Sequence, residues 1–356
     1  MKKLGRAFNH LEDLTFFYGS EGALEALTHL KEVNHDASSL RMKWDGGLQI
    51  YWGRETVDGP LIFTGHNGWA RGAKSRSSGE LVDFIMNQSG GVKTVDEAKI
   101  RAVFAHEFAN LYNHFDEATP RDFIGFVYGD ALFREKQTPE NDVYNLYPNK
   151  TGYHIGKNTD LGKSIETVDC MIAVHAYFPE FGMDDDQQIP KDDFSDFKND
   201  KLLIINPYYN RIQVSIDVYI LENYILTHSS TLDSFLAPMQ GVSSLKDYIY
   251  KYINTKAKRK ELHTLGDDFI EWLDTAKISV TQCQKIRNRI AEHPGTVDVM
   301  FETVKYIMNL KNSIIDQIDS GPTDIKTTNS EGWVRYAGVD NKFGNVKFVP
   351  RHRWLP

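Results

Sequence analysis

The feature that most constrains the fold of this chain is the tetrapeptide Lys-Trp-Asp-Gly at residues 43–46. It lies between two runs that predict strands: residues 39–42, in which polar and apolar residues alternate, and residues 48–52, which are mostly apolar and aromatic. Asp-Gly between two strands is a common signal of a tight hairpin turn. One interpretation is therefore an ordinary β-hairpin with an exposed lysine, and the other is a lysine placed for chemistry.

The composition is that of an ordinary globular protein, with 41% hydrophobic and 25% charged residues among 356. This length allows one large domain or two ordinary domains, each with its own core. The 41 basic and 49 acidic residues give a formal net charge of −8. Any polynucleotide would therefore have to be held on a local basic surface.

Two further features bear on the compartment. Cys170 and Cys283 show no paired spacing, so neither a disulfide framework nor a cysteine-based zinc site is predicted. No apolar run approaches the ~20 residues of a membrane span, and no apolar signal core follows the N-terminal lysines. We therefore expect a cytoplasmic protein without a membrane partner.

Hydrophobic periodicity predicts an α+β fold. An amphipathic helix is expected at residues 95–115, with residues 98, 100, 103, 104, 108 and 111 mostly on one side. Four later runs predict strands: residues 123–133, 169–178, 201–206 and 211–221. Apolar spacings of three and four then predict helices over residues 231–319. We expect a helical accessory module at 231–320, between two strand-containing segments at 1–230 and 321–356.

Five stretches together resemble the covalent nucleotidyltransferase superfamily, which comprises ATP-dependent DNA and RNA ligases and mRNA capping enzymes. They occur in that superfamily's order: Lys-Trp-Asp-Gly at 43–46, Gly-Asp at 129–130, an apolar strand at 169–178, Glu-Gly-Trp at 331–333 and a lysine strand at 345–349. The order of segments is most similar to that of a phage protein family with a ligase-like core. The resemblance implies a nucleotidyltransferase (adenylylation) core of antiparallel sheets with flanking helices at residues 1–230, to which the final strands at 321–356 return. It also implies a location in the host cytoplasm if a phage encodes the protein.

The resemblance assigns the nucleophile to Lys43, because the superfamily's lysine attacks the α-phosphate of a nucleotide and carries the nucleotidyl group as a phosphoramidate. It places Asp45 and Gly46 in the same nucleotide site. Many ligases have an arginine two residues after this glycine, where Leu48 stands here. Arg54, at the far end of the same strand, is the candidate substitute.

The later stretches supply the remaining implied roles around the nucleotide. Asp130 would contact the ribose or a metal ion, although ligases have glutamate here. His175 would take the place of the ring that stacks on adenine, and Tyr177, two residues on, is the next candidate on the same face. A buried histidine with ordinary packing partners is the alternative interpretation.

The C-terminal stretches complete the implied site. Glu331 would bind the catalytic metal together with Asp130. Lys347 would contact the α-phosphate, with Lys342 as a weaker helper, because ligases usually have two lysines in this strand. Carboxylates suit Mg²⁺, with Mn²⁺ as a substitute, and neighbouring cations favour the deprotonated amine that attacks.

Basic residues suggest where a nucleic-acid backbone would lie. Three occur in a stretch rich in glycine and serine at residues 69–79: Arg71, Lys74 and Arg76. Five occur in the predicted helical module: Lys258, Arg259, Lys260, Arg287 and Arg289. A solvated surface is the alternative interpretation for each of these runs.

The resemblance implies an ATP-dependent polynucleotide ligase that acts through lysyl-AMP and joins a 5′-phosphate to a 3′-hydroxyl. The chain has no room for an OB-fold after Lys347, which favours joining of RNA ends. One alternative is a DNA ligase that uses the helical module in place of an OB-fold. A second alternative is a ligase-derived nucleotide-binding or scaffold protein that seals nothing. The sequence does not indicate an oligomeric state.

Overall fold

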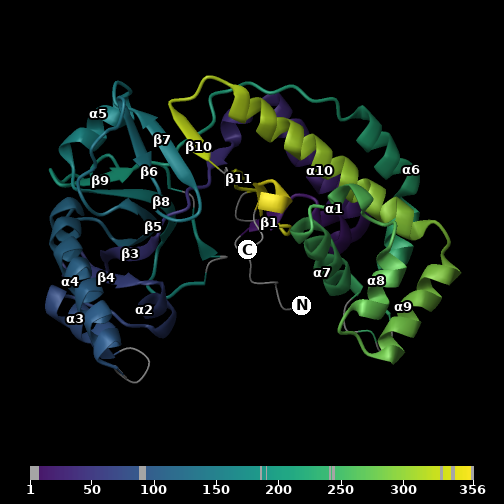
Figure 1. Ribbon diagram of the computed structural model, residues 1–356, viewed down its shortest axis with the longest axis horizontal. Helices are drawn as coiled ribbons and strands as arrows, with labels where there is room; N and C mark the ends of the chain where they lie inside the picture. The colour runs from purple at the N-terminus through teal and green to yellow at the C-terminus, as the bar shows by residue number, and fades with distance from the viewer. Residues whose placement is uncertain are drawn as a thin grey trace. The chain divides into compact units, whose positions relative to one another are not determined.

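The computed structural model describes residues 8–87, 94–184, 187–189, 191–239, 242, 245–328, 332–337 and 341–353. The chain divides into two compact units (Figure 1). The first unit contains residues 1–6, 43–208 and 324–329, and the second contains residues 7–42, 209–323 and 330–356. The predicted helical module therefore falls inside the second unit, together with the first long helix and the last two strands.

The first unit is built on a five-stranded sheet with the strand order β4-β3-β5-β8-β9. Its strands are β3 (Leu48–Arg54), β4 (Ile62–Gly65), β5 (Gly125–Phe133), β8 (Cys170–Phe178) and β9 (Leu202–Ile205). All neighbours pair antiparallel except β8 and β9, which are parallel. The α+β class is thus confirmed, as are four of the predicted strands of this unit.

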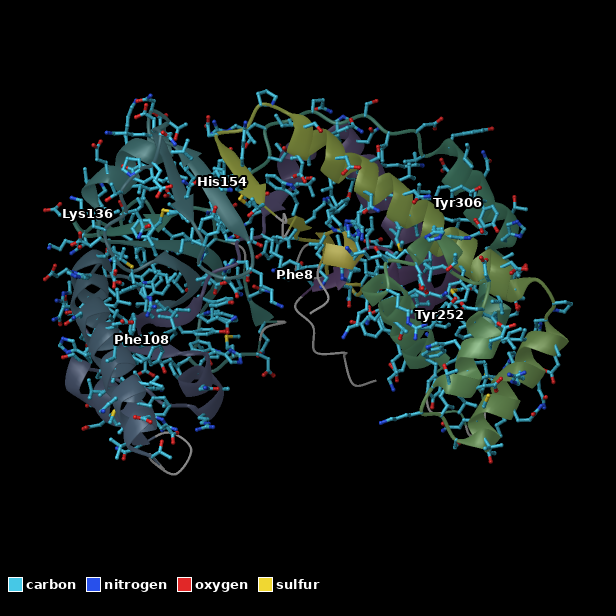
Figure 2. All side chains as sticks on the ribbon, viewed as in Figure 1. Phe8, Phe108, Lys136, His154, Tyr252 and Tyr306 are labelled. Atoms are coloured by element: carbon cyan, nitrogen blue, oxygen red, sulfur yellow. The ribbon has the colours of Figure 1, made fainter. Side chains whose placement is uncertain are left out.

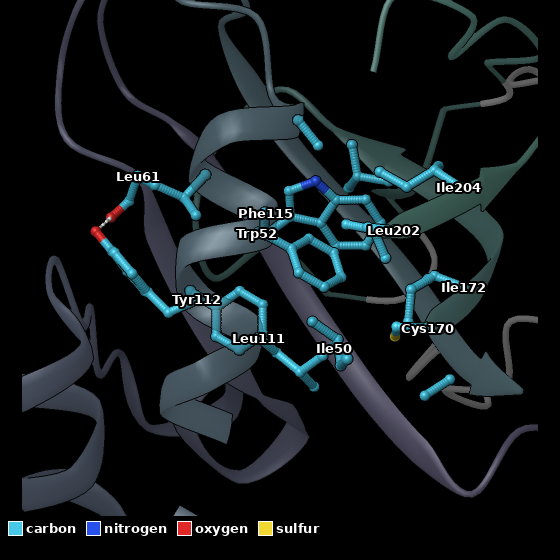
Figure 3. Close-up of a cluster of buried hydrophobic side chains, with 14 of the residues drawn as sticks. Ile50, Trp52, Leu61, Leu111, Tyr112, Phe115, Cys170, Ile172, Leu202 and Ile204 are labelled. Atoms are coloured by element: carbon cyan, nitrogen blue, oxygen red, sulfur yellow. Dashed lines mark hydrogen bonds between the residues drawn. The ribbon is translucent and has the colours of Figure 1, made fainter. Parts of the chain in front are cut away.

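Two helices, α3 (Ser78–Asn87) and α4 (Val95–Ala118), cover one face of this sheet (Figure 1). Figure 3 shows the resulting core, in which the ring of Trp52 lies 4.7 Å from that of Phe115 between centroids. The predicted apolar side of α4 is partly wrong, because Ile100 and Val103 are 71% and 60% exposed. The residues of α4 that face the core are Ala105, Phe108, Leu111, Tyr112, Phe115 and Ala118.

A second, smaller sheet of the first unit has the order β10-β7-β6. It consists of β6 (Val143–Leu146), β7 (Gly152–Gly156) and β10 (Ile325–Thr328), all paired antiparallel. Two short helices, α2 (His66–Arg71) and α5 (Asp160–Thr167), complete the unit. The smaller sheet thus joins a C-terminal segment of the chain to the strand that carries Tyr153.

The second unit combines a four-stranded sheet with a group of helices. The sheet has the order β1-β12-β11-β2 and consists of β1 (Phe8–His10), β12 (Asn345–Phe348), β11 (Trp333–Arg335) and β2 (Arg41–Met42). The α-helices described in this unit are α1 (Asp13–His35), α6 (Tyr219–Leu236), α7 (Leu245–Lys258), the short α8 (Phe269–Thr275), α9 (Val280–Glu292) and α10 (Thr296–Ser320). Their apolar faces enclose a core around Tyr252, whose ring contacts those of Phe269 and Phe301.

The strand predicted at residues 211–221 is wrong. Residues 211–218 form no regular element, and α6 begins at Tyr219. Leu221, Ile225 and Leu232 are buried along one side of that helix, so the apolar residues that suggested a strand belong partly to a helical stripe.

His29 of α1 makes the stability of the second unit depend on pH. Its side chain is 1% exposed, bonds to Arg335 and lies 3.4 Å from a Glu25 carboxylate oxygen. Burial, with the positive charge of Arg335 as the second cause, lowers the pKa of His29 from 6.5 to about 3.

The unfolded chain binds this proton more tightly, so the second unit should lose stability as the pH falls below 6.5. The expected loss from this group is about 1.4 kcal/mol per pH unit until the pH approaches the folded pKa. Urea unfolding of the wild type and His29→Gln between pH 7 and 4 measures it, with α1 followed by hydrogen exchange. Identical pH dependence in both proteins would contradict the assignment.

Candidate functional site

The Lys-Trp-Asp-Gly segment is not the turn of a hairpin. The strand before it, β2, pairs with β11 in the second unit, whereas the strand after it, β3, pairs with β4 and β5 in the first. The two flanking strands therefore do not pair with each other, and the interpretation as an ordinary β-hairpin is wrong. Residues 43–47 form an irregular connection at the start of the first unit.

Hydrogen bonds hold the backbone of this connection along its length. Three successive amides donate: Asp45 to the Tyr153 hydroxyl at 2.6 Å, Gly46 to the Asp130 carboxylate at 3.2 Å, and Gly47 to the Ala131 carbonyl at 3.1 Å. The segment directly after Lys43 is thus fixed to both sheets of the first unit.

Close packing explains the two glycines of the segment. A Cβ on Gly46 would lie 2.4 Å from the Cβ of Asp130, and a Cβ on Gly47 would lie 2.4 Å from the Pro148 carbonyl oxygen. Neither approach is sterically possible without a shift of the backbone. The glycines are therefore required by contact with β5 and with the loop before β7, and not by a turn conformation.

The smaller sheet supports the segment through Tyr153 of β7. Trp44 is 2% exposed, and its ring lies 4.8 Å from that of Tyr153. Asn149, in the loop before β7, donates from its side-chain amide to the Asp45 carboxylate at 3.1 Å. The sequence did not predict the roles of Tyr153 and Asn149, because no local pattern indicates that β7 packs against this segment.

Removal of the Tyr153 hydroxyl should loosen the lysine segment without disturbing the core. In Tyr153→Phe the ring still packs on Trp44, but the Asp45 amide loses its acceptor, a change worth about 1 kcal/mol. We expect amide exchange of residues 44–47 to become several-fold faster, as measured by hydrogen-exchange mass spectrometry. Tyr144→Phe, at a buried position of neighbouring β6, is the matched control and should leave these amides unchanged. Equal exchange in the wild type and Tyr153→Phe would show that the hydroxyl does not hold the segment.

Asp130 and His175 meet beside Gly46 through a β-bulge. Tyr128 pairs with Ala176 and Gly129 with Val174, so His175 is the additional residue of β8. Its Nε2 lies 3.2 Å from Oδ2 of Asp130, the same oxygen that accepts the Gly46 amide. Bulges commonly redirect a side chain next to functional sites.

The same bulge reverses the alternation of β8. Tyr177 packs with the core that faces α4, and its hydroxyl donates to the carbonyl of Ile124. Ala176 and Phe178 instead face the opposite side of the sheet, with Tyr51. The prediction that Tyr177 shares a face with His175 is therefore wrong.

Asp130 is 6% exposed, and only one of its two carboxylate oxygens has a hydrogen-bond partner among the described residues. Its Oδ1 is buried and has no hydrogen-bond partner among the described residues. A buried carboxylate oxygen without a donor is unfavourable, and it is the kind of ligand that Mg²⁺ prefers. In the part of the chain that the structure describes, no group of three or more His, Cys, Asp or Glu side chains is placed to hold a metal ion. Glu331, the other predicted ligand, lies outside the described residues.

A cleft of about 420 Å³ opens beside this segment. Its polar lining comes from Asp45, Gln49, His66, Asn67, Asp130 and Asn149, and its apolar lining from Leu48, Leu81, Phe84, Ile85, Phe104 and Phe108, with Gly46, Gly47 and Gly65 between them. Three of the predicted site residues, Asp45, Gly46 and Asp130, thus line one cavity. Ligand sites commonly have such a mixed lining and a volume of roughly 300–1,000 Å³.

Tyr128 is a further residue of this region that sequence reasoning missed. It stacks on Tyr51 at 4.7 Å, lies 5.1 Å from the ring of His175, and accepts a hydrogen bond from Gln49 at 2.9 Å. Tyr128 lies two residues before Asp130 on the same strand, and residues at this spacing share a face of a sheet. This spacing could have indicated that Tyr128 lies beside Asp130.

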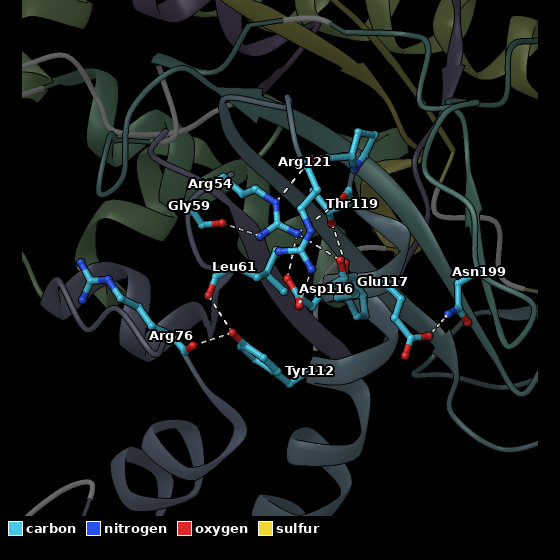
Figure 4. Close-up of polar contacts among 12 residues, drawn as sticks. Arg54, Gly59, Leu61, Arg76, Tyr112, Asp116, Glu117, Thr119, Arg121 and Asn199 are labelled. Atoms are coloured by element: carbon cyan, nitrogen blue, oxygen red, sulfur yellow. Dashed lines mark hydrogen bonds and ion pairs between the residues drawn. The ribbon is translucent and has the colours of Figure 1, made fainter. Parts of the chain in front are cut away.

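Arg54 has a structural role in place of the predicted nucleotide contact (Figure 4). Its side chain is 0% exposed, and its guanidinium donates to the carbonyls of Gly59 at 2.7 Å and Thr119 at 3.2 Å. It also donates to the carbonyl of Pro120 and to both the carbonyl and carboxylate oxygens of Asp116. The arginine therefore ties the end of β3 to the loop after α4.

Both predicted C-terminal lysines lie in the second unit. Lys347 of β12 is 6% exposed, and its charge acts on the buried carboxyl of Asp13. Lys342 forms an ion pair with Glu21. Each lysine therefore has a carboxylate of its own unit nearby.

The predicted phosphate-backbone residues fall in both units, three of them in the first and five in the second. Arg71 is exposed at the end of α2, while Lys74 and Arg76 form ion pairs with Glu55 at 2.6 and 3.3 Å. Lys258, Arg259 and Lys260 are exposed at the end of α7. Arg287 forms an ion pair with Asp274 at 2.6 Å, and Arg289 donates to the Ser234 carbonyl at 3.2 Å.

Fold and site together define an α+β protein with mixed sheets, in which a lysine-bearing segment is fastened beside a buried carboxylate and a cleft. The chain belongs to DUF6267, a family of unknown function, which matches residues 92–354. This match includes Asp130, His175 and Lys347 and begins after the Lys-Trp-Asp-Gly segment. Comparisons with curated proteins and with solved structures each gave no match. Among the described residues, no helix has the length and apolar character needed to span a membrane.

Proposed function

We propose that the protein is a nucleotidyltransferase in which Lys43 carries AMP, and more specifically an ATP-dependent polynucleotide ligase. The observation that supports this most strongly is the fastening of residues 45–47 to Tyr153, Asp130 and Ala131. An in-line attack on phosphorus depends on exact placement of the attacking atom. A rigid backbone directly after a lysine, at the rim of a cleft, provides such placement.

In the proposed reaction, the Lys43 amine attacks the α-phosphorus of ATP. A nitrogen–phosphorus bond forms, the bond from that phosphorus to the α,β-bridging oxygen breaks, pyrophosphate leaves and the amine proton passes to solvent. A 5′-phosphate oxygen of a polynucleotide then displaces the lysine and takes the AMP. Finally, a 3′-hydroxyl attacks that 5′-phosphate, AMP leaves, and a phosphodiester joins the two ends.

The carboxylates of Asp45 and Asp130 fit a cation-assisted form of this chemistry. Asp45 and Asp130 are two acidic residues of the cleft lining, and their negative charges would repel a triphosphate. Oδ1 of Asp130 has no donor among the described residues to neutralise it. Mg²⁺ or Mn²⁺, held by Asp130, would neutralise charge on the phosphate oxygens when bound. His175 and the Gly46 amide both contact Oδ2, which leaves Oδ1 for the cation.

The joining step is tested with protein that already carries AMP. Adenylylated protein, freed of ATP, is mixed with nicked duplexes that have a 5′-phosphate on either an RNA or a DNA strand. We expect the RNA strand to be sealed faster and AMP to be released in equal amount. Lys43→Ala, treated in the same way, should seal neither strand.

One observation favours a second candidate function, a nucleotide-binding scaffold. The guanidinium of Arg54, the candidate substitute for the arginine of ligases, is engaged in structural hydrogen bonds, and Lys342, the expected helper at the α-phosphate, pairs with Glu21. An adenylylated protein that transfers its AMP to neither nicked RNA nor nicked DNA would favour a different AMP acceptor. A protein that binds ATP without forming the adduct would favour the scaffold.

A further inference from the structure

The cleft beside the lysine segment has two chemically different walls. One wall includes the polar residues Asp45, Asp130 and Asn149. The other wall is apolar, and its residues come from the two helices that cover the sheet: Leu81, Phe84 and Ile85 from α3, and Phe104 and Phe108 from α4. We call this second surface the α3–α4 wall.

Phe104 gives the α3–α4 wall an exposed aromatic surface. Its side chain is 36% exposed, whereas Phe108, which Figure 2 labels, is 2% exposed. The two ring centroids lie 4.9 Å apart with an angle of 34° between the planes. Phe104 thus rests on a fixed ring and still presents area to the cleft, and a flat ligand would remove that area from water.

His175 is poorly placed for the same task. Its Nε2 is engaged with Asp130 at 3.2 Å, and its ring lies 5.1 Å from that of Tyr128. It does not line the cleft that Asp45, Gly46 and Asp130 share with the α3–α4 wall. Its contacts instead orient the Asp130 carboxylate.

We propose that the α3–α4 wall binds the base of the nucleotide whose phosphates lie at the lysine segment, with Phe104 as the stacking residue. This inference rests on the proposed function and adds the position of the base to it. A nucleoside triphosphate has one flat, largely apolar end and one highly charged end, which matches the division of the cleft. A single cavity of about 420 Å³ connects the two walls, so one ligand can reach both.

The test measures equilibrium binding to the full-length protein with Lys43→Ala, which prevents covalent turnover. Titration calorimetry with MgATP gives the Kd in this background and after each further substitution. Phe104→Ala should raise the Kd about tenfold, since loss of one ring–base stack typically has that effect or a larger one. Phe104→Trp should restore most of the affinity. Ile100→Ala, on the same helix at a 71% exposed position outside the cleft, is the control and should not change the Kd.

Inorganic tripolyphosphate distinguishes loss of a base contact from loss of the site. Its Kd should be the same with and without Phe104→Ala, because it lacks a base. If Phe104→Ala weakened tripolyphosphate as much as ATP, the stacking role would be overturned. If His175→Ala weakened ATP while Phe104→Ala did not, the base would lie at β8, and the inference would fail while the proposed function stood. If the protein bound neither ATP nor tripolyphosphate, the proposed function itself would fail.

Discussion

Lys43→Arg is expected to abolish formation of the AMP adduct, with a rate at least about a thousandfold below the wild type. Arginine keeps the positive charge and most of the length, but its guanidinium does not lose a proton in proteins and so cannot attack phosphorus. ATP binding should change little, because the charge is kept. The rate is measured by acid quench after mixing with ATP labelled at the α-phosphate.

The matched control for this variant is Lys150→Arg, at an exposed position next to Asn149 in the same unit. It should form the adduct at the wild-type rate. A Lys43→Arg protein that still became labelled at a comparable rate would show that another residue accepts the nucleotidyl group. A Lys150→Arg protein that lost the reaction would show that the effect is not specific to Lys43.

Lys311→Met is expected to lower the free energy of unfolding of the second unit by about 3–5 kcal/mol. Lys311 of α10 is 0% exposed, and its Nζ lies 2.7 Å from Oε2 of Glu12, which is also 0% exposed. Arg351, in the short helix η5 (Arg351–Arg353), bonds to Oε1 of Glu12 at 3.2 Å and also to Asp13. The substitution leaves a buried carboxylate with one of its two cationic partners.

The charges of this buried cluster are unevenly balanced. Burial raises the pKa of Glu12, but the attraction of Lys311 and Arg351, together with the hydrogen bonds that Glu12 accepts, lowers it below its ordinary value. For Asp13, burial outweighs the attraction of Arg351, and its pKa is raised. Oδ2 of Asp13 has no hydrogen-bond partner among the described residues. The ion pair of Lys311 with Glu12 is therefore the contact whose loss should be felt most.

Urea unfolding, followed by hydrogen exchange of α10 peptides, measures this loss. Lys305→Met is the control on the same helix, because Lys305 is 22% exposed and pairs with Glu302 near the surface. It should change the free energy of unfolding by less than about 1 kcal/mol. Glu12→Gln combined with Lys311→Met should recover part of the loss, since no unpaired charge remains. Equal losses for Lys311→Met and Lys305→Met would contradict the buried-pair account.

Local patterns in the sequence predicted much of the fold. Alternating or continuous apolar runs correctly predicted β3, β5, β8 and β9, because apolar residues of these strands lie in the core beneath α3 and α4. The prediction failed at residues 211–221, where α6 begins. It also failed for the first turns of α4, where Ile100 and Val103 are exposed. In both places the buried face depends on which element packs against the helix. The spacing of apolar residues alone does not determine that element.

The candidate site was predictable to the extent that its residues lie in one sheet or directly before it. Asp45, Gly46 and Asp130 come together because β3 and β5 are neighbours with Gln49 opposite Asp130. The support from Tyr153 depends on the smaller sheet, whose strand β10 is distant in sequence, and no local signal indicates it. The bulge at His175 likewise depends on the register between β5 and β8. It places His175 beside Asp130 and turns Tyr177 toward the core that faces α4.

The intact mass of the protein after incubation with ATP and Mg²⁺ shows whether Lys43 carries AMP. The protein is first treated with pyrophosphate, which removes any AMP already attached, and Lys43→Ala is measured beside it. The account predicts that the wild type gains the mass of one AMP and that Lys43→Ala gains nothing. A wild-type protein with unchanged mass, or a Lys43→Ala protein with the same gain, would contradict it.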